Sequence, residues 1–129
     1  MRVLFVCTGN ICRSPMAEAL AASRYPASGV TFSSAATGGL SGYPASEPAR
    51  RVMDEIGVDL SEHRSLDVLT AIAEPPDLIY CMTDGHRDRL LALRPEWSAR
   101  ILLLDPNGRS IADPYGLDDA TYRRARDEI

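Results

Sequence analysis

Short apolar runs and amphipathic segments alternate along the chain. Runs rich in β-branched and aromatic residues indicate strands, and apolar residues at helical spacing indicate helices. Short strands separated by helices pair in parallel through right-handed crossovers. We therefore expect a three-layer α/β/α fold around a four-stranded parallel twisted sheet, with a phosphate-binding loop after the first strand. The expected strands are about residues 2–7, 30–34, 78–82 and 100–104, and the expected helices lie near 14–24, 46–56, 65–73, 83–93 and 118–129.

Length and composition fit a single globular domain. The chain has 129 residues, of which 45% are hydrophobic and 25% are charged. This length is enough to bury a core, so we expect one domain over residues 1–129. In the last predicted helix, Tyr122, Ala125 and Ile129 form an apolar stripe, but no Gly or Pro stop follows them. We therefore expect this C-terminal helix to be cut short.

Charge and cysteine usage narrow the compartment and the partners. The net charge of −4 disfavours nucleic-acid binding. No apolar run approaches the length of a membrane span, and the chain opens on a predicted strand rather than a signal peptide. Three cysteines, an odd number, are typical of the reducing cytoplasm when one of them is reactive. No spacing of His, Cys and Asp indicates a metal site. We expect a cytoplasmic protein that binds no metal, no nucleic acid and no membrane.

The segment between the first predicted strand and the first predicted helix carries the strongest chemical signal. Cys7 closes the strand, Arg13 lies six positions on, and the helix follows at once. A helix N-terminus offers free backbone N–H groups and a partial positive charge, and Arg13 adds a planar fork of donors suited to phosphate. These surroundings stabilise a thiolate, the nucleophilic form of cysteine. The segment predicts an oxyanion cradle with the Cys7 sulfur at its centre.

The other residues of this loop fit the same interpretation. Gly9 and Asn10 tolerate positive φ, which lets successive N–H groups point inward. Ser14 can donate its hydroxyl to the Cys7 sulfur or cap the helix, and Pro15 suits the first helical turn. The residues expected to line or bind the phosphate group are Thr8, Gly9, Asn10, Ile11, Cys12 and Ser14.

The leaving group of a phosphate ester needs a proton, and two Asp-Pro pairs could supply it. Asp105 follows the fourth predicted strand and precedes Asn107-Gly108, a turn signature that favours a structural role. Asp113 lies in the loop that follows. Because loops at the carboxyl ends of parallel strands form the site, both reach the edge of the sheet that holds Cys7.

The string Val-Cys-Thr-Gly-Asn-Ile-Cys-Arg-Ser-Pro-Met-Ala-Glu at residues 6–18 resembles the low-molecular-weight protein tyrosine phosphatases. Segments 34–37, 77–82 and 113–116 match the same family in order, so the resemblance spans essentially the whole chain. It implies a phosphatase domain over residues 1–129 that hydrolyses phosphotyrosine in proteins or peptides through a phosphocysteine. Inorganic phosphate is the product and no cofactor is implied. We expect a monomer or a weak dimer.

The resemblance also implies a role for each matching residue. Cys7 would be the nucleophile, Arg13 the phosphate clamp and Asp113 the general acid and then base. Tyr115 would wall the pocket mouth, opposite an apolar wall from Ile11. Two further roles come from the family alone, since it implies that Cys12 forms a reversible disulfide with the nucleophile and that His63 supports the loop through the Asn10 position.

Two departures from the family pattern leave the substrate open. Tyrosine phosphatases of this family often carry an aromatic residue near Leu40, and here Tyr43 is the candidate replacement. Met82-Thr83 is similar to the bacterial branch that includes protein arginine phosphatases. That branch places Thr where this chain has Ile11, and an apolar Ile11 favours phosphotyrosine over phosphoarginine.

Two further competitors fit less well. Arsenate reductase shares the Cys-x5-Arg loop and needs two further cysteines, of which Cys81 lies near the first but Asp88 occupies the place of the second. Phosphoryl-carrier modules of sugar transport hold phosphate on a similar loop but should lack Arg13 and an acid loop.

Overall fold

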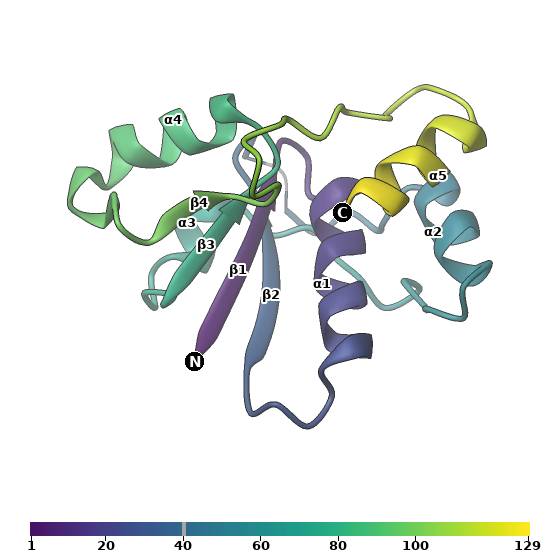
Figure 1. Ribbon diagram of the computed structural model, residues 1–129, viewed down its shortest axis with the longest axis horizontal. Coiled ribbons are helices and arrows are strands. Elements are labelled where there is room, and N and C mark those ends of the chain that lie inside the picture. The colour runs from purple at the N-terminus through teal and green to yellow at the C-terminus, as the bar shows by residue number, and fades with distance from the viewer. Residues whose placement is uncertain (40) are drawn as a thin grey trace.

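The protein is a four-stranded parallel sheet covered by helices on both faces (Figure 1). The computed structural model describes residues 1–39 and 41–129. The sheet order is β2-β1-β3-β4, so the first strand lies inside the sheet between β2 and β3. The strands are β1 (Arg2–Cys7), β2 (Thr31–Ala36), β3 (Leu78–Cys81) and β4 (Ile101–Leu103).

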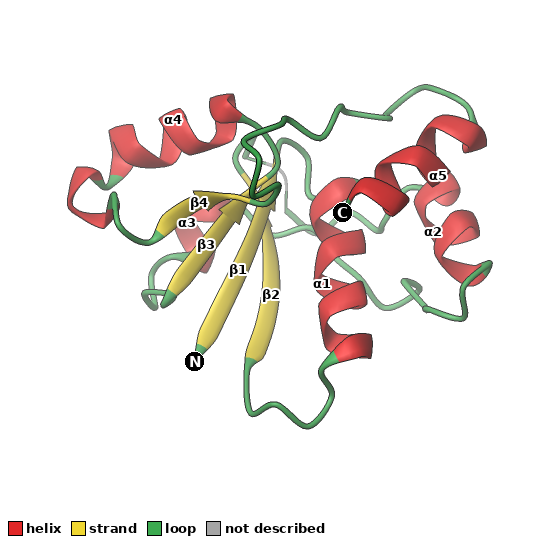
Figure 2. Ribbon diagram, viewed as in Figure 1, coloured by secondary structure: helices red, strands yellow, loops and turns green. Residues whose placement is uncertain are grey.

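The helices divide between the two faces (Figure 2). On one face lie α1 (Arg13–Arg24), α2 (Glu47–Asp54) and α5 (Asp119–Glu128). On the other lie α3 (Val68–Ala71) and α4 (Asp84–Leu93), with a 3-10 turn, η1, at Pro95–Trp97. Ser46, Thr83 and Asp118 cap α2, α4 and α5 with side-chain oxygens that accept a backbone N–H from the first turn.

Alternation along β1 creates two hydrophobic cores. Val3 and Phe5 join the core beneath α1, α2 and α5, whereas Leu4 and Val6 join the core beneath α3 and α4. This follows from the two-residue period of a strand, which points successive side chains to opposite faces. Because β1 pairs with β2 on one side and β3 on the other, its C-terminal residue Cys7 lies in the interior of the sheet, at the edge formed by the carboxyl ends of the strands.

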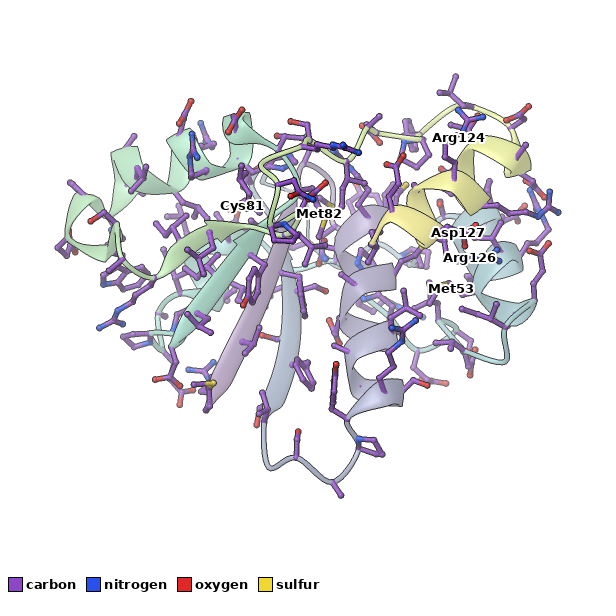
Figure 3. All side chains as sticks on the ribbon, in the orientation of Figure 1. Met53, Cys81, Met82, Arg124, Arg126 and Asp127 are labelled. Carbon is purple, nitrogen blue, oxygen red and sulfur yellow. The ribbon has the colours of Figure 1, made fainter. Side chains whose placement is uncertain are left out.

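Ion pairs tie α5 to α2. Glu55, which follows α2, accepts from the guanidinium groups of Arg123 and Arg126, and Arg51 pairs with Asp119. Arg126 also donates to the carbonyl oxygen of Val52 at 2.7 Å, and Figure 3 shows it between the two helices. These contacts fix the position of α5 against the core, and Tyr122 of α5 reaches Cys12 of the loop that follows β1.

The predicted fold is confirmed, with differences at the ends of elements. The second strand begins one residue later than expected and continues to Ala36, because Ala36 pairs with Cys7 in the parallel register. The helix expected over 65–73 is shorter, since α3 begins only after its cap Asp67. Before it, the Ser65 backbone N–H donates to the Tyr43 carbonyl oxygen at 2.7 Å rather than within a helix, and Pro75 and Pro76 follow the helix closely. Among the described residues, no helix has the length and apolar character needed to cross a membrane.

Candidate active site

The phosphate loop curls around the sulfur of Cys7. It leaves β1 at Cys7 and enters α1 at Arg13, after Cys12 at the N-cap position. Asn10 has φ 55°, the left-handed conformation that the sequence predicts for this loop, and its backbone N–H donates to Cys7 Sγ at 3.3 Å. Within the loop this conformation falls on Asn10 and not on Gly9. The turn aims a backbone donor at the sulfur, as an anion-binding nest does.

A buried serine completes the surroundings of the sulfur. Ser14 Oγ lies 3.0 Å from Cys7 Sγ and accepts a hydrogen bond from Asn10 Nδ2 at 2.8 Å. Because the Asn10 amide already donates to this oxygen, the hydroxyl proton of Ser14 is directed to the sulfur. Sγ therefore receives two hydrogen bonds at the N-terminus of α1.

Asn10 is held from outside the loop. Its carbonyl oxygen lies 2.7 Å from His63 Nε2, and because a carbonyl only accepts, this nitrogen carries the proton. Asn10 Oδ1 accepts the backbone N–H of Leu66 at 3.0 Å. Asn10 and Ser14 are fully buried and, unlike the other loop residues, do not line the pocket. They hold the loop in shape from behind.

Arg13 is buried, lines the same pocket as Cys7 and has spare donor capacity. Its side chain is 3% exposed, Nη1 donates to the carbonyl oxygen of Ile111 at 2.8 Å, and Nη2 lies 3.7 Å from Asp113 Oδ2. Nε is buried and finds no hydrogen-bond partner among the residues that the structure describes. A buried unpaired donor is costly, and here it belongs to a residue that lines the pocket of Cys7.

Most of the predicted site residues, but not Asn10, Ser14 or His63, line one pocket of about 260 Å³. The two Asp-Pro pairs separate clearly. Asp113 lies at the pocket, is 51% exposed in its side chain, and accepts the Tyr115 backbone N–H at 3.1 Å. Asp105 lines a different groove beside β4 and accepts the Asn107 backbone N–H in a tight turn. The pocket is lined by Cys7, Thr8, Gly9, Ile11, Cys12, Arg13, Asp113 and Tyr115.

The walls of the pocket are apolar on two sides. Ile11 is partly buried and packs against the core with its inner surface. Tyr115 is 64% exposed at the mouth. The aromatic wall expected near Leu40 lies outside the described residues, and Tyr43, its candidate replacement, is exposed and does not line the pocket. Among the described residues, Ile11 and Tyr115 are therefore the large apolar side chains that line the pocket.

Cys12 belongs to a buried polar triangle that the sequence did not reveal. Its Sγ lies 3.3 Å from Tyr122 Oη of α5 and 3.5 Å from Ser46 Oγ, and the two oxygens are 3.3 Å apart. Burial raises the pKa of the Cys12 thiol and also that of Tyr122. Both therefore stay protonated at neutral pH. The apolar stripe of the last helix pointed Tyr122 inward, and its buried hydroxyl needed a partner.

Cys81 and His86 lie outside the pocket. Cys81 ends β3 in the core under α4, where burial raises its pKa to about 12 (Figure 3). His86 had no partner in the sequence analysis, yet its Nε2 lies 2.9 Å from Thr8 Oγ1. Asp88, in the place of the second relay cysteine of an arsenate reductase, is an exposed residue of α4.

Known proteins similar to this chain are phosphatases. The family model of the low molecular weight phosphotyrosine protein phosphatases matches residues 2–129. A probable low molecular weight protein-tyrosine-phosphatase, EpsP of Ralstonia nicotianae, is 38% identical over 98% of this chain and 87% of its own length. The YwlE arginine phosphatase from Geobacillus stearothermophilus has a TM-score of 0.90 at 37% identity, over 98% of this chain and 84% of that one. Vibrio vulnificus Wzb in complex with benzylphosphonate has a TM-score of 0.89 at 31% identity, over 98% and 89%. The chain belongs to the low molecular weight phosphotyrosine protein phosphatase family.

Proposed function

We propose that this protein hydrolyses phosphotyrosine in proteins or peptides by transferring the phosphoryl group first to Cys7 and then to water. The observation that carries the proposal is a buried Arg13 Nε with no partner among the described residues, in the same pocket as a sulfur that accepts two hydrogen bonds. Both features suit a tetrahedral dianion at the mouth of the loop. Its oxygens would accept from Arg13 and from loop N–H groups, while its phosphorus faces the sulfur.

The first step is displacement at phosphorus. The Cys7 thiolate forms the S–P bond as the P–O bond to the tyrosine oxygen breaks, and Asp113 gives its proton to the departing phenoxide. The position of Asp113 at the pocket rim supports this assignment over Asp105, which lies in another groove. Charge spread over the phosphoryl oxygens is stabilised by Arg13 and the loop donors.

The second step releases the enzyme. Asp113, now a carboxylate, accepts a proton from water as the water oxygen attacks phosphorus and the S–P bond breaks. The products are inorganic phosphate and the Cys7 thiolate. Ser14 favours this step because its hydroxyl is already directed at Sγ and stabilises the departing sulfur anion.

The pocket walls support a phosphotyrosine substrate. Ile11 and Tyr115 offer apolar surface to an aromatic ring, and a solved relative at 31% identity carries benzylphosphonate. A guanidinium would lose water against Ile11 without gaining an acceptor there, which costs about 1–3 kcal/mol for a buried donor. The alternative substrate is phosphoarginine. The similarity of this chain to the YwlE arginine phosphatase supports it as a second candidate.

The remaining expectations follow from the same proposal. The working partners are a phosphorylated protein or peptide and inorganic phosphate, in a cytoplasmic protein that acts as a monomer or weak dimer. Cys12 is the proposed redox partner of Cys7, and both are free thiols that line one pocket.

A side-by-side turnover assay of phosphotyrosine and phosphoarginine peptides tests the proposal. We expect phosphotyrosine to be preferred by tenfold or more, because about 1.4 kcal/mol already gives that factor. Cys7→Ser should abolish turnover and retain phosphate binding, and Cys81→Ser serves as the matched cysteine control. Substantial turnover by Cys7→Ser would exclude the phosphocysteine route, and faster hydrolysis of phosphoarginine would replace the substrate.

A further inference from the structure

His86 is a buried side chain that contacts the phosphate loop and takes no part in the proposed chemical steps. It is the third residue of α4 and is 6% exposed. Its Nε2 lies 2.9 Å from the hydroxyl oxygen of Thr8, and its Nδ1 lies 3.2 Å from that of Thr83. Thr8 directly follows Cys7 and lines the pocket. One imidazole therefore joins the first turn of α4 to the first residue of the loop.

We propose that His86 is a positioning residue, a neutral imidazole that donates its Nε2–H to Thr8 and thereby fixes the start of the phosphate loop. The Thr8 hydroxyl then acts as an acceptor toward His86 and keeps its own proton for the pocket side. This inference rests on the proposed function, because it concerns how the same loop holds its oxyanion.

The proton arrangement follows from the cap of α4. Thr83 Oγ1 accepts the His86 backbone N–H at 3.3 Å. Its own proton needs an acceptor, and among the described residues the other group bonded to this hydroxyl is His86 Nδ1. Thr83 therefore donates to Nδ1, and a neutral imidazole must then carry its proton on Nε2. The reverse tautomer would leave the Thr83 proton without a partner in the part of the chain that the structure describes.

The surroundings keep His86 neutral. Burial and the nearby guanidinium of Arg13 lower its pKa to about 4, while Asp113 opposes this shift. A second proton would sit on Nδ1 and displace the hydrogen bond from Thr83. At neutral pH the ring is thus held in one orientation and one tautomer by its own helix cap.

His86 completes the anchoring of Thr8. The backbone of this residue is already held on the β2 side, where Thr8 O accepts the Gly38 N–H at 2.8 Å. The approach is so close that a Cβ on Gly38 would lie 2.9 Å from Thr8 O. His86 holds the side chain from α4 on a separate contact. With His63 at Asn10, two histidines from outside the loop hold it at two points. Small displacements of such groups weaken oxyanion binding.

A double-mutant cycle tests whether Thr8 and His86 act as a pair. Thr8→Val removes the acceptor at constant shape, and His86→Phe removes both ring nitrogens. The probe is inorganic phosphate, whose Kd is measured by titration, together with kcat/KM for an aryl phosphate. We expect each single change to weaken phosphate binding about three- to tenfold, the scale of one hydrogen bond. The double variant should be no weaker than the worse single variant, and additive losses would overturn the proposal.

Two further measurements separate positioning from mere stability. His86→Gln keeps an amide donor and should restore most of the lost affinity, whereas Arg87→Gln, in the same turn of α4, should leave it unchanged. Nitrogen-15 NMR at neutral pH should show a neutral His86 protonated at Nε2, and a cation or the other tautomer would refute the assignment. If His86→Phe does not fold, Thr8→Val and the NMR signal still decide. Because phosphate affinity needs no turnover, failure of the proposed hydrolysis is distinguishable from failure of this inference.

Discussion

Replacing Asp113 by Asn removes the proposed proton donor and little else. The Asn amide oxygen can still accept the Tyr115 backbone N–H, so the acid loop should keep its shape. The pair with Arg13 spans 3.7 Å and half of the Asp113 side chain is exposed, so its loss should hardly affect folding. The change therefore isolates the chemical step.

The expected loss in kcat is about 10²–10⁴, the usual contribution of general acid catalysis, which equals about 2.7–5.4 kcal/mol of transition-state free energy. The loss should depend on the leaving group. A tyrosine-like phenol has a pKa of about 10 and needs protonation, whereas a nitrophenol is a good leaving group without it.

The assay compares kcat for phenyl phosphate and nitrophenyl phosphate in wild type, Asp113→Asn and Asp105→Asn. The Asp113 variant should lose much more with the phenyl ester. Asp105→Asn is the matched control, since its amide oxygen can likewise accept the Asn107 backbone N–H and the residue lies in another groove, so this ratio should not change. Equal losses for both esters, or a leaving-group effect in the Asp105 variant, would refute the reasoning.

Three further results are expected. Ile11→Thr should narrow or reverse the preference for phosphotyrosine over phosphoarginine, since Thr has less apolar surface and offers an acceptor, and unchanged ratios would contradict this. Mild peroxide should oxidise Cys7 to a sulfenic acid that condenses with Cys12, releasing water, and peptide mapping should find this disulfide rather than one to Cys81. The free energy of unfolding should fall as the pH is lowered from about 6.5 to 4, because His86 becomes protonated in the unfolded chain over this range but stays neutral in the native one. His86→Gln should flatten that part of the urea-unfolding profile, and an identical slope would count against the shift.

The sequence was most informative where the site is local. The loop from Cys7 to Arg13 is contiguous, so its strand, its turn residues and its helix start can be read together. Helices and strands could likewise be predicted from periodicity, because each is formed by contiguous residues. The helix expected over 65–73 was too long because the Ser65 backbone N–H and hydroxyl bond to the distant Tyr43 backbone, and no local pattern indicates such tertiary bonds.

The contacts that hold the loop could not be predicted in this way. Thr8 and His86 are 78 positions apart, and Cys12 and Tyr122 are 110 positions apart. Their meeting depends on the order of the strands and on the packing of α4 and α5. Periodicity also could not decide between Asp105 and Asp113, because both follow β4. Only the path of the loop in the folded protein brings Asp113 to the pocket.

Buried polar groups nonetheless offered a clue that periodicity did not use. A buried hydroxyl or imidazole needs a partner, so Tyr122 on an inward-facing stripe and His86 near the start of a helix both implied a contact elsewhere in the chain. In the folded protein each finds one, and in each case it is a residue of the phosphate loop. Arg13 differs because its Nε stays unpaired within the described residues after the protein contacts are made. Groups that pair within the protein hold the loop, and we expect the donor that does not pair, Arg13 Nε, to bind the substrate.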